Sequence, residues 1–342
     1  MTERKMATIR IIDSIDPIPD ADKIEVCTIG GWKVVSQKGI HQVGNKVIYL
    51  EIDSWVPNNI APFLTAPGHY PKEYNGVKGE RLKTVKLRGQ VSQGLLLPLA
   101  EFFDPTLDWE VGQDVSELLC VSKYEPPVSA QLAGQVLGKF PSFIRKTDQE
   151  RIQNLSKEFS FWREDGSLWE VTEKLDGSSM TVYIKDGRFG VCSRNLDLKE
   201  DENNAFWKVA RQEKLEEKLR ELCFRGTEYA LQGELIGEGV QKNPYKLKGQ
   251  KFFLFDIWNI STAEYVSVDA RREISETYNI EHVPVISKTT FLPETSISDI
   301  ITLSDRQSML GKVSAEGLVY KRMDGLASFK AISNKYLLKN DA

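Results

Sequence analysis

A lysine followed by an Asp-Gly pair is the first feature of this chain that could carry covalent chemistry. Lys174 lies in EKLDGSSMTVYIKDGRFGVCSRN, two residues before Asp176, and a Ser-Arg-Asn triplet ends the stretch. A lysine amine becomes a nucleophile once it has lost its proton, so this residue could form a covalent bond to a nucleotide. Because Asp-Gly is common in turns, the tetrapeptide alone is more typical of a surface lysine beside a turn.

Five further residues that follow Lys174 in order change that balance. They are Arg194 in SRN, Glu234 in ALQGELIGEG, Phe255 in KFFLFDIW, Glu316 in EGLVYK and Lys330 in SFKAISNKYLLK. Each one alone has an ordinary structural explanation, because strand ends, turns, apolar cores and solvated strands all use these residue types. Their combination and order favour a nucleotide-binding site.

The ordered set resembles the motifs of the covalent nucleotidyltransferases, which comprise ATP-dependent DNA and RNA ligases and mRNA capping enzymes. The phrases GELIGEGVQKNPYKL, EGLVYKR and FKAISNKYLLK, with KTDQERIQNL upstream, look more like RNA ligases than DNA ligases. Because its N-terminal region also reads as a small barrel, the chain resembles the nick-sealing RNA ligases that carry an N-terminal OB domain. This resemblance covers nearly the whole sequence.

The resemblance implies a role for each matched residue. Lys174 would be the nucleophile that carries AMP, Lys330 would contact the α-phosphate, and Glu316 would hold Mg²⁺ or Mn²⁺, which prefer oxygen ligands. The implied ATP- or AMP-binding residues are Asp176, Gly177, Arg194, Glu234, Phe255, Lys335, Arg151 and Gln153.

Within this set, the resemblance assigns different contacts to different side chains. Gly177 would permit the tight turn after the lysine, and Asp176 would lie within reach of ribose or metal. Glu234 would bind a ribose hydroxyl, and Phe255 would stack on adenine. Arg194 would contact the ribose and the acceptor side of the nick, because its guanidinium fork suits a phosphate.

Three further positions match the family's pattern less directly. Arg151 and Gln153 are candidates for the adenine edge, but a helix beginning after Thr147 or Asp148 would explain the same segment. Many related RNA ligases have two lysines spaced KxK in the last motif, whereas Ile332 occupies the second place here. Lys335 could substitute for that second lysine.

The implied chemistry requires a lysine with an unusual environment. A free lysine, with a pKa of ~10.4, is almost wholly protonated at neutral pH and cannot attack. A nearby metal ion, with Lys330 adding positive charge, would lower the pKa of Lys174, whereas carboxylates would raise it. AMP would pass from ATP to Lys174, then to a 5′-phosphate, and an RNA 3′-hydroxyl within a duplex would finally displace it.

Two alternatives remain open at this point. DNA ligases and capping enzymes share the motifs but carry a C-terminal OB domain, which we do not expect here because the sequence ends about a dozen residues after Lys330. A non-catalytic OB-type RNA-binding protein with a decayed nucleotidyltransferase domain would have lost reactive residues, whereas Lys174, Glu234 and Glu316 are retained.

The elements that must position these residues indicate an α+β protein with antiparallel sheets. After residue 140, strand-like runs such as WEVTEKL, SSMTVYI, FGVCSR, EYALQGELI and KFFLFDIWNI alternate with a few helical segments, including AFWKVARQEKLEEKLRELC. An Asp186-Gly187 pair predicts a hairpin turn. We expect a nucleotidyltransferase domain at 141–342, and a linker at 121–140 because Pro126-Pro127 and a Gly/Ala/Ser run disfavour regular structure there.

Residues 1–120 read as a β-rich OB-like domain. ATIRIIDSI, KIEVCTI, WKVVS and KVIYLEI are short β-branched runs separated by Gly, Pro and Asp, which suggests a small closed barrel. The stretch 72–88 carries six basic residues against two acidic ones. Lys83, Lys86 and Arg88 are candidate nucleic-acid contacts, although an edge strand protected by charge would look the same.

Composition places the chain among intracellular globular proteins. The net charge of −4 excludes a strongly basic coat, and we find neither a membrane-spanning apolar run of ~20 residues nor a signal peptide. The four cysteines lack CxxC spacing and are expected as free thiols, which favours a cytoplasmic location; they are Cys27, Cys120, Cys192 and Cys223. RNA, or an RNA/DNA duplex containing a nick, is the expected partner, and no obligate protein partner is implied.

Overall fold

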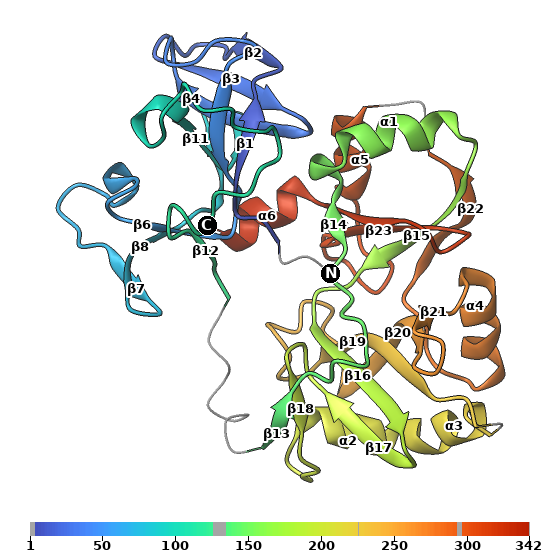
Figure 1. Cartoon of the computed structure of the whole chain (residues 1–342). Helices are drawn as coiled ribbons and strands as arrows, with labels where there is room; N and C mark the ends of the chain where they lie inside the picture. The colour runs from blue at the N-terminus through green and yellow to red at the C-terminus, as the bar shows by residue number, and fades with distance from the viewer. Residues whose placement is uncertain (1–3, 126–134, 225, 293–295, 342) are drawn as a thin grey trace. The chain divides into compact units, whose positions relative to one another are not determined.

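The computed structural model describes residues 4–125, 135–224, 226–292 and 296–341. These residues fall into two compact units (Figure 1). The N-terminal unit consists of Met1–Pro127 with Gln153–Ser156 and Leu337–Ala342, and the second unit of Val128–Ile152 with Lys157–Tyr336.

The N-terminal unit is built from short antiparallel strands. Its sheets, in spatial order, are β1–β5–β11, β2–β3–β4, β12–β6–β8–β7 and the hairpin β9–β10. The bounds are β1 (Ala7–Ile11), β2 (Ser14–Pro17), β3 (Ile24–Ile29), β4 (Trp32–Gln37), β5 (Lys46–Leu50), β6 (Ser54–Pro57), β7 (Lys72–Tyr74), β8 (Val77–Arg81), β9 (Thr84–Leu87), β10 (Gln90–Gln93), β11 (Leu95–Pro98) and β12 (Ser122–Lys123), with 3₁₀ turns η1 (Pro62–Leu64) and η2 (Leu99–Glu101).

Strand β5 organises the core of this unit because it is buried on both faces. Val47 and Tyr49 belong to one cluster of buried apolar residues, while Ile48 and Leu50 belong to another. Successive side chains of a strand point to opposite faces, so one five-residue strand contributes to two cores. This arrangement explains why KVIYL reads as a continuous apolar run rather than an alternating one.

The second unit contains two sheets of different size. The seven-stranded antiparallel sheet has the order β13–β18–β17–β16–β19–β20–β21, and the five-stranded sheet has the order β14–β24–β23–β15–β22, in which only β14 and β24 run parallel. The bounds are β13 (Val136–Lys139), β14 (Glu150–Arg151), β15 (Leu168–Lys174), β16 (Ser178–Lys185), β17 (Arg188–Cys192), β18 (Leu196–Leu198), β19 (Tyr229–Gly237), β20 (Gln250–Asn259), β21 (Glu264–Tyr265), β22 (Val285–Phe291), β23 (Gly317–Arg322) and β24 (Ser328–Ile332).

Helices accompany these sheets and confirm the α+β class. After residue 140 they are η3 (Ile152–Asn154), α1 (Ser156–Glu164), α2 (Ala205–Gln212), α3 (Leu215–Leu222), α4 (Val268–Thr277), α5 (Ile297–Ser304) and α6 (Asn334–Asp341). Most of η3 and of α6 groups with the N-terminal unit. Helices α2 and α3 pack their apolar faces, including Trp207 and Leu219, on residues of the seven-stranded sheet such as Leu231 (Figure 1). No helix within the described residues is both long and apolar enough to cross a membrane.

Three predictions about local structure can be compared with the observed elements. The periodic segment 205–223 is helical, as predicted, and is divided into α2 and α3 because Lys214 adopts a left-handed conformation (φ 54°) between them. Part of the predicted linker is regular, since β12 and β13 lie within 121–140, while its residues 126–134 lie outside the described part of the chain. The predicted hairpin turn is present, with positive φ at Asp186 and Gly187.

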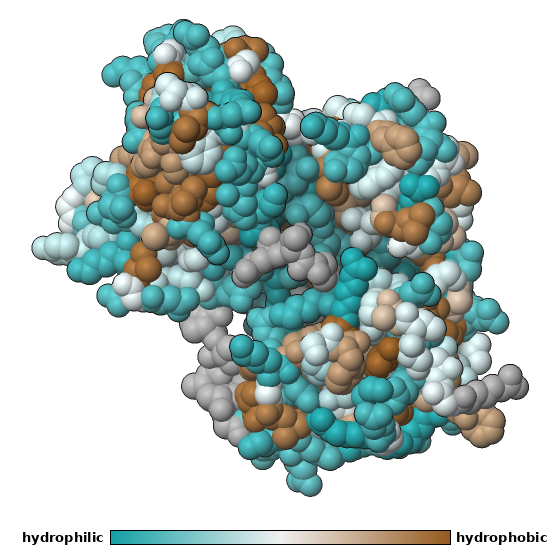
Figure 2. Space-filling view, viewed as in Figure 1, coloured by the Kyte–Doolittle hydropathy of each residue, from teal (hydrophilic) through white to brown (hydrophobic). Residues whose placement is uncertain are grey.

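The face of the molecule shown in Figure 2 is mostly polar. On the face shown in Figure 2, hydrophobic residues form small patches separated by hydrophilic ones. Several exposed apolar side chains, such as Tyr70 and Phe224, lie apart in the sequence. Scattered apolar residues of this kind are normal on protein surfaces and do not by themselves mark a binding site.

Candidate active site

Two neighbouring strands of the five-stranded sheet bring Lys174 and Glu316 together. Lys174 is the last residue of β15, and it pairs with Gly317, the first residue of β23. Because Glu316 directly precedes β23, this register places its carboxylate beside the lysine, with 2.8 Å between Lys174 Nζ and Glu316 Oε1. The side chains remain 27% and 16% exposed, which leaves the pair accessible to a ligand.

Glu234 reaches the same pair from the seven-stranded sheet. It lies on β19, which is hydrogen-bonded to β16 on one side and to β20 on the other. Its carboxyl group interacts electrostatically with Lys174, Glu316 and Arg194. The candidate site is therefore assembled from both sheets of the second unit.

The turn after the lysine is held by three polar side chains. The backbone N–H of Asp176 donates to the Tyr245 hydroxyl at 2.7 Å. The Gln241 side-chain amide donates to the Gly177 carbonyl at 3.1 Å. The Tyr336 hydroxyl donates to the Asp176 carboxylate. These contacts leave the turn little freedom to reorient.

Gly177 is required for a different reason from the expected tight turn. Its φ does not lie in the left-handed region that favours glycine. Instead, a Cβ at this position would lie 2.4 Å from the Leu235 carbonyl oxygen and 2.5 Å from Ile236. The glycine thus permits the turn to approach β19 closely.

The charges around Lys174 favour its protonated form. Burial lowers the pKa of Lys174, but the carboxylates of Glu316, Glu234 and Asp176 outweigh that effect, and the net shift is upward. Burial raises the pKa of Glu234 to about 8, and burial also raises the pKa of Glu316, with Lys174 opposing both shifts. An additional cation at this site would offset the carboxylates and release the amine.

The donor set of the site suits a divalent metal that keeps much of its own hydration. Among the described residues, no group of three or more His, Cys, Asp or Glu side chains lies close enough to hold a metal unaided. Glu316, Glu234 and Asp176 nevertheless interact around one lysine, and all present oxygen donors. Mg²⁺ is commonly held by one or two carboxylates together with waters and substrate phosphates, so these residues fit such an ion.

Phe255 is set apart from its aromatic neighbours by a β-bulge. Gln232 pairs with Asp256 and the next residue of β19 pairs with Leu254, so Phe255 is the extra residue on β20. Phe252 is fully buried in the core, whereas Phe255 is only partly buried. The bulge thus leaves this ring partly exposed at the margin of a buried cluster that includes Phe253.

A buried lysine lies beneath this ring. Lys321 Nζ lies 5.6 Å from the centroid of Phe255, donates to the Phe255 carbonyl, and pairs with Asp256 at 2.7 Å. Burial lowers the pKa of Lys321 to about 8, with Asp256 opposing that shift. These contacts anchor the backbone that carries Phe255.

Arg194 follows β17 at the edge of the site. Its Nη2 atom lies 3.0 Å from both carboxylate oxygens of Asp148, and about half of each side chain is exposed. The predicted alternative, a helix beginning after Asp148, is wrong, because β14 and η3 follow and α1 begins at Ser156. An exposed ion pair of this kind contributes little stability and exchanges readily for another anion.

The remaining predicted nucleotide contacts lie at different depths. Lys330 on β24 interacts electrostatically with Glu316, and it pairs in parallel register with Arg151 of β14, which is buried. Lys335 is 72% exposed and its Nζ lies 3.9 Å from Asp305. Gln153 groups with the N-terminal unit, where its carbonyl accepts a hydrogen bond from the Gly31 N–H.

The three predicted nucleic-acid contacts lie on one exposed hairpin of the N-terminal unit. Lys83 precedes β9, Lys86 lies on it, and Arg88 forms the turn to β10 with positive φ, followed by Gly89. All three side chains are exposed, and so is Val85 between them. A phosphate backbone could therefore approach this hairpin.

Sequence reasoning missed four residues around the site. Glu173 is 1% exposed, and its Oε1 has no hydrogen-bond partner in the described part of the chain, while its Oε2 accepts from the Met309 N–H at 2.8 Å. Its position directly before Lys174 in the sequence could have indicated that it lies near the site. Lys321, Tyr245 and Tyr336 lie in the recognised phrases, but their residue types gave no indication of a role.

Comparisons with known proteins agree with this geometry. A family model described as RNA ligase matches residues 167–336, and one described as an OB-fold domain matches residues 6–99. The OB prediction for the N-terminal region is thereby confirmed. A search of curated proteins found no match.

Solved structures of one Naegleria gruberi RNA ligase are similar over the full length. An apo variant is 45% identical with a TM-score of 0.91, covering 100% of this chain and 99% of that one. A variant with ATP and Mn is 45% identical with a TM-score of 0.91, and the match covers 98% of this chain and 99% of that one. The structure of the same protein with PPi is 45% identical with a TM-score of 0.90, and the match covers 99% of each chain.

Proposed function

Because the chain belongs to the RNA ligase family, we propose that it is an ATP-dependent enzyme that seals nicks between a 3′-hydroxyl and a 5′-phosphate through a lysyl-AMP intermediate. The observation that carries this proposal is the lysine at the end of β15, paired with Glu316 and facing Glu234 and Asp176. The N. gruberi protein binds ATP and Mn, which supports ATP as the substrate here and a divalent metal as cofactor.

In the first proposed step, deprotonated Lys174 attacks the α-phosphorus of ATP. A nitrogen–phosphorus bond forms, the bond to the bridging oxygen breaks, and pyrophosphate leaves. Lys330 contacts the α-phosphate and stabilises the charge that develops on it. Glu316 would hold a divalent metal, and such an ion would supply positive charge that favours the deprotonated amine and stabilises the phosphate.

The nucleotide pocket is assigned by matching residues to their surroundings. Phe255, which is only partly buried at its bulge, stacks on adenine, and Glu234 binds a ribose hydroxyl. Arg151 and Gln153 contact the adenine edge. Asp176, Gly177, Arg194 and Lys335 complete the ATP- and AMP-binding set. The free carboxylate oxygen of Glu173 is a further acceptor suited to an exocyclic amine.

The second and third steps transfer AMP and join the ends. The 5′-phosphate of the broken strand attacks the lysyl-AMP phosphorus, which frees the Lys174 amine and gives an adenylylated end. The 3′-hydroxyl then attacks that 5′-phosphate, and AMP leaves. Arg194 contacts the acceptor side of the nick by exchanging Asp148 for phosphate.

The N-terminal unit binds the duplex that contains the nick. Lys83, Lys86 and Arg88 present three positive charges on an exposed hairpin and contact backbone phosphates. A ribose 2′-hydroxyl is the group that distinguishes RNA from DNA at the 3′-hydroxyl end. We therefore propose that the strand supplying this end is RNA.

Sealing of defined nicks tests the proposal. Duplexes carrying a labelled 5′-phosphate at the nick are incubated with the protein, a divalent metal and either ATP or GTP, with RNA or DNA on the 3′-hydroxyl side. We expect sealing with ATP and an RNA 3′-end, and transient accumulation of the adenylylated strand. Equal sealing of DNA 3′-ends would indicate a DNA ligase, and dependence on GTP would indicate capping-type chemistry.

A protein that binds the duplex but seals nothing would be the non-catalytic RNA-binding alternative. Binding is followed separately with the nucleotide omitted, so that loss of sealing is not confused with loss of substrate binding. Glu316→Ala serves as the matched variant, because it removes the proposed metal ligand without altering the N-terminal unit.

A further inference from the structure

The Asp176-Gly177 turn is fixed from two directions by groups with no part in the reaction described above. Tyr245 accepts the backbone N–H of Asp176 at 2.7 Å, and Tyr336 donates to its carboxylate. One phenol therefore holds the backbone and the other the side chain of the same residue. Asp176 in turn influences Lys174 and Glu316 electrostatically.

The segment that presents Tyr245 is built to be rigid. Between β19 and β20, Gln241, Asn243 and Lys246 all have positive φ, which non-glycine residues adopt rarely. The Asn243 side chain closes this loop by bonding both the N–H and the carbonyl of Leu247, at 3.1 and 2.9 Å. Strained backbone of this kind persists where the surrounding structure fixes it, and it clusters at functional sites.

Tyr245 itself is locked in place by packing. It is 7% exposed and belongs to a cluster of buried apolar residues with Leu175, Ile236 and Phe253. Leu175 lies between Lys174 and Asp176, so the same cluster holds the turn and the ring that supports it. The phenol oxygen therefore has one available position relative to the Asp176 N–H.

Tyr336 is placed by the start of α6. Its N–H donates to the Ser333 hydroxyl at 3.1 Å, and that hydroxyl donates to Asp305. The N–H of Lys335 also bonds Asp305, at 3.3 Å. Since Ser333 directly follows β24, the strand that carries Lys330, this anchoring fixes the distance along the chain from the strand to the Tyr336 ring.

We propose that Tyr245 and Tyr336 are positioning residues that orient Asp176 during transfer of AMP to Lys174; this inference rests on the proposed function. A carboxylate free to rotate would compete with Glu316 for the lysine, because it lies close to both charges. A carboxylate held by a phenol keeps one direction and leaves the second oxygen for the ligand. The two rings thus control an active-site residue without touching the reacting atoms.

Phenylalanine variants isolate the two hydroxyls from the packing of the rings. Tyr336→Phe removes the donor to the Asp176 carboxylate. Tyr245→Phe removes the hydroxyl that accepts the backbone N–H of Asp176. Misplacement of a catalytic group by about 1 Å can lower the rate of a preorganised step by up to about a hundredfold. Binding of ATP through the adenine ring should change little, because both aromatic rings are kept and only their hydroxyl bonds to Asp176 are lost.

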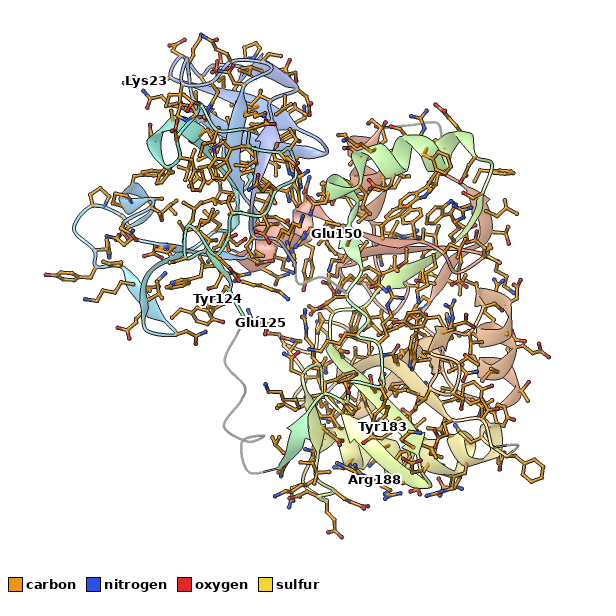
Figure 3. All side chains as sticks on the ribbon, in the orientation of Figure 1. Lys23, Tyr124, Glu125, Glu150, Tyr183 and Arg188 are labelled. Atoms are coloured by element: carbon orange, nitrogen blue, oxygen red, sulfur yellow. The ribbon has the colours of Figure 1, made fainter. Side chains whose placement is uncertain are left out.

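Tyr183→Phe is the matched control because it removes the same kind of contact away from the site. Tyr183 is 1% exposed, and its hydroxyl donates to Asp197 at 3.0 Å. Figure 3 shows Tyr183 beside Arg188, on strands β16 and β17 of the seven-stranded sheet, apart from Glu150 of β14. Loss of this bond should lower the thermal midpoint without changing the reaction of the folded enzyme.

The test is a single-turnover measurement of lysine adenylylation against ATP concentration for the full-length chain. We expect Tyr245→Phe and Tyr336→Phe to lower the maximal rate at least roughly tenfold, with the half-saturating ATP concentration unchanged within about threefold. Tyr183→Phe should keep the wild-type rate. Thermal unfolding midpoints measured on the same samples show which variants are folded. If one of the two site variants does not fold, the rate of the other tests the inference.

The inference would be overturned if both folded site variants had maximal rates within about twofold of the rate of Tyr183→Phe. That result would leave the proposed function intact. A rise in half-saturating ATP with an unchanged maximal rate would also overturn it, because that result assigns the phenols to substrate binding. Absence of adenylate from the wild type would instead remove the ligase assignment, and the inference with it.

Discussion

At the scale of single residues, the site is governed by an excess of negative charge around one amine. Three carboxylates raise the pKa of Lys174 against the effect of burial, so the resting site holds an ammonium that cannot attack. In the proposed reaction, a cation that arrives with the substrate would offset these carboxylates and release the amine. The same carboxylates offer the oxygen atoms that a divalent cation prefers.

The stacking role of Phe255 gives a prediction at this scale. Phe255→Ala should raise the half-saturating ATP concentration by roughly tenfold to a hundredfold, because stacking on an aromatic ring is worth about 1–3 kcal/mol per base. Phe255→Tyr keeps an aromatic face and should restore affinity to within about threefold. Equal half-saturation in the two variants, measured by titrating ATP in the adenylylation assay, would argue against stacking.

The sequence singled out the charged side chains that meet at the site but missed the residues that hold them. Lys174, Glu234 and Glu316 stand in recognisable phrases, and the structure brings all three together. Tyr245 and Tyr336 stand in similar phrases. Tyrosine is also common in apolar cores, so the residue type alone does not predict the hydrogen bond that its hydroxyl makes. Such roles depend on three-dimensional contacts between distant segments.

At the scale of elements, the site depends on local departures from regular strand geometry. The bulge on β20 leaves one ring of an otherwise buried aromatic strand partly exposed. The close approach of Gly177 to β19 lets both sheets contribute carboxylates. Short β-branched and apolar runs predicted the strands. It could not predict the bulge, because one inserted residue leaves the local composition unchanged.

Gly177→Ala tests the close approach. The added Cβ would meet the Leu235 carbonyl at 2.4 Å, so the turn must move away from β19, at a cost of about 1–3 kcal/mol in unfolding free energy. We expect adenylylation to fall sharply as well. Gly138→Ala is the control, since a Cβ there meets nothing within 4 Å and its φ is not left-handed. Similar stability and activity in both variants would contradict the account of Gly177.

A buried ion network behind the site predicts a pH dependence of stability. The His282 Nε2 accepts from Arg271 at 3.1 Å, and its Nδ1 lies 2.7 Å from the Val283 carbonyl, which together favour the neutral ring. Burial, assisted by Arg271, lowers the pKa of His282 to about 3. The unfolded chain therefore binds a proton that the folded chain excludes, between about pH 6.5 and 3.

Stability should accordingly be lost as the pH falls through that window. The contribution of His282 to the slope of unfolding free energy is up to about 1.4 kcal/mol per pH unit. His282→Gln should flatten the slope by that amount, as measured by urea unfolding at several pH values between about 6.5 and 4. An unchanged slope in a folded variant would show that His282 is charged in the folded state or does not titrate.

At the scale of the whole molecule, the proposed tasks are divided between the two units. With the exception of Gln153, the residues assigned to AMP transfer belong to the second unit, whereas the basic hairpin belongs to the N-terminal one. Composition could not reveal this division, because a net charge of −4 conceals the local excess of positive charge at 72–88. The two activities should be separable by substitution.

Replacing Lys83, Lys86 and Arg88 together with Ala should weaken binding of a nicked duplex while leaving lysine adenylylation within about twofold of wild type. The slope of log affinity against log salt should fall by roughly 2 to 3 in magnitude, because each phosphate that is no longer neutralised keeps about one counterion.

The control replaces three exposed lysines of the same unit, Lys23, Lys33 and Lys38. Figure 3 shows Lys23 at the end of this unit near β3. Equal losses in the two variants would indicate general charge attraction rather than a binding face.

The most direct test of the central claim is the site of covalent attachment of AMP. The protein is incubated with ATP labelled at the α-phosphate and a divalent metal, and the adduct is mapped by peptide mass spectrometry, alongside Lys174→Ala and the surface control Lys185→Ala. We predict an acid-labile AMP adduct on Lys174 in the wild type and the control, and none in Lys174→Ala. An adduct on another residue, or none in folded wild-type protein, would contradict the account.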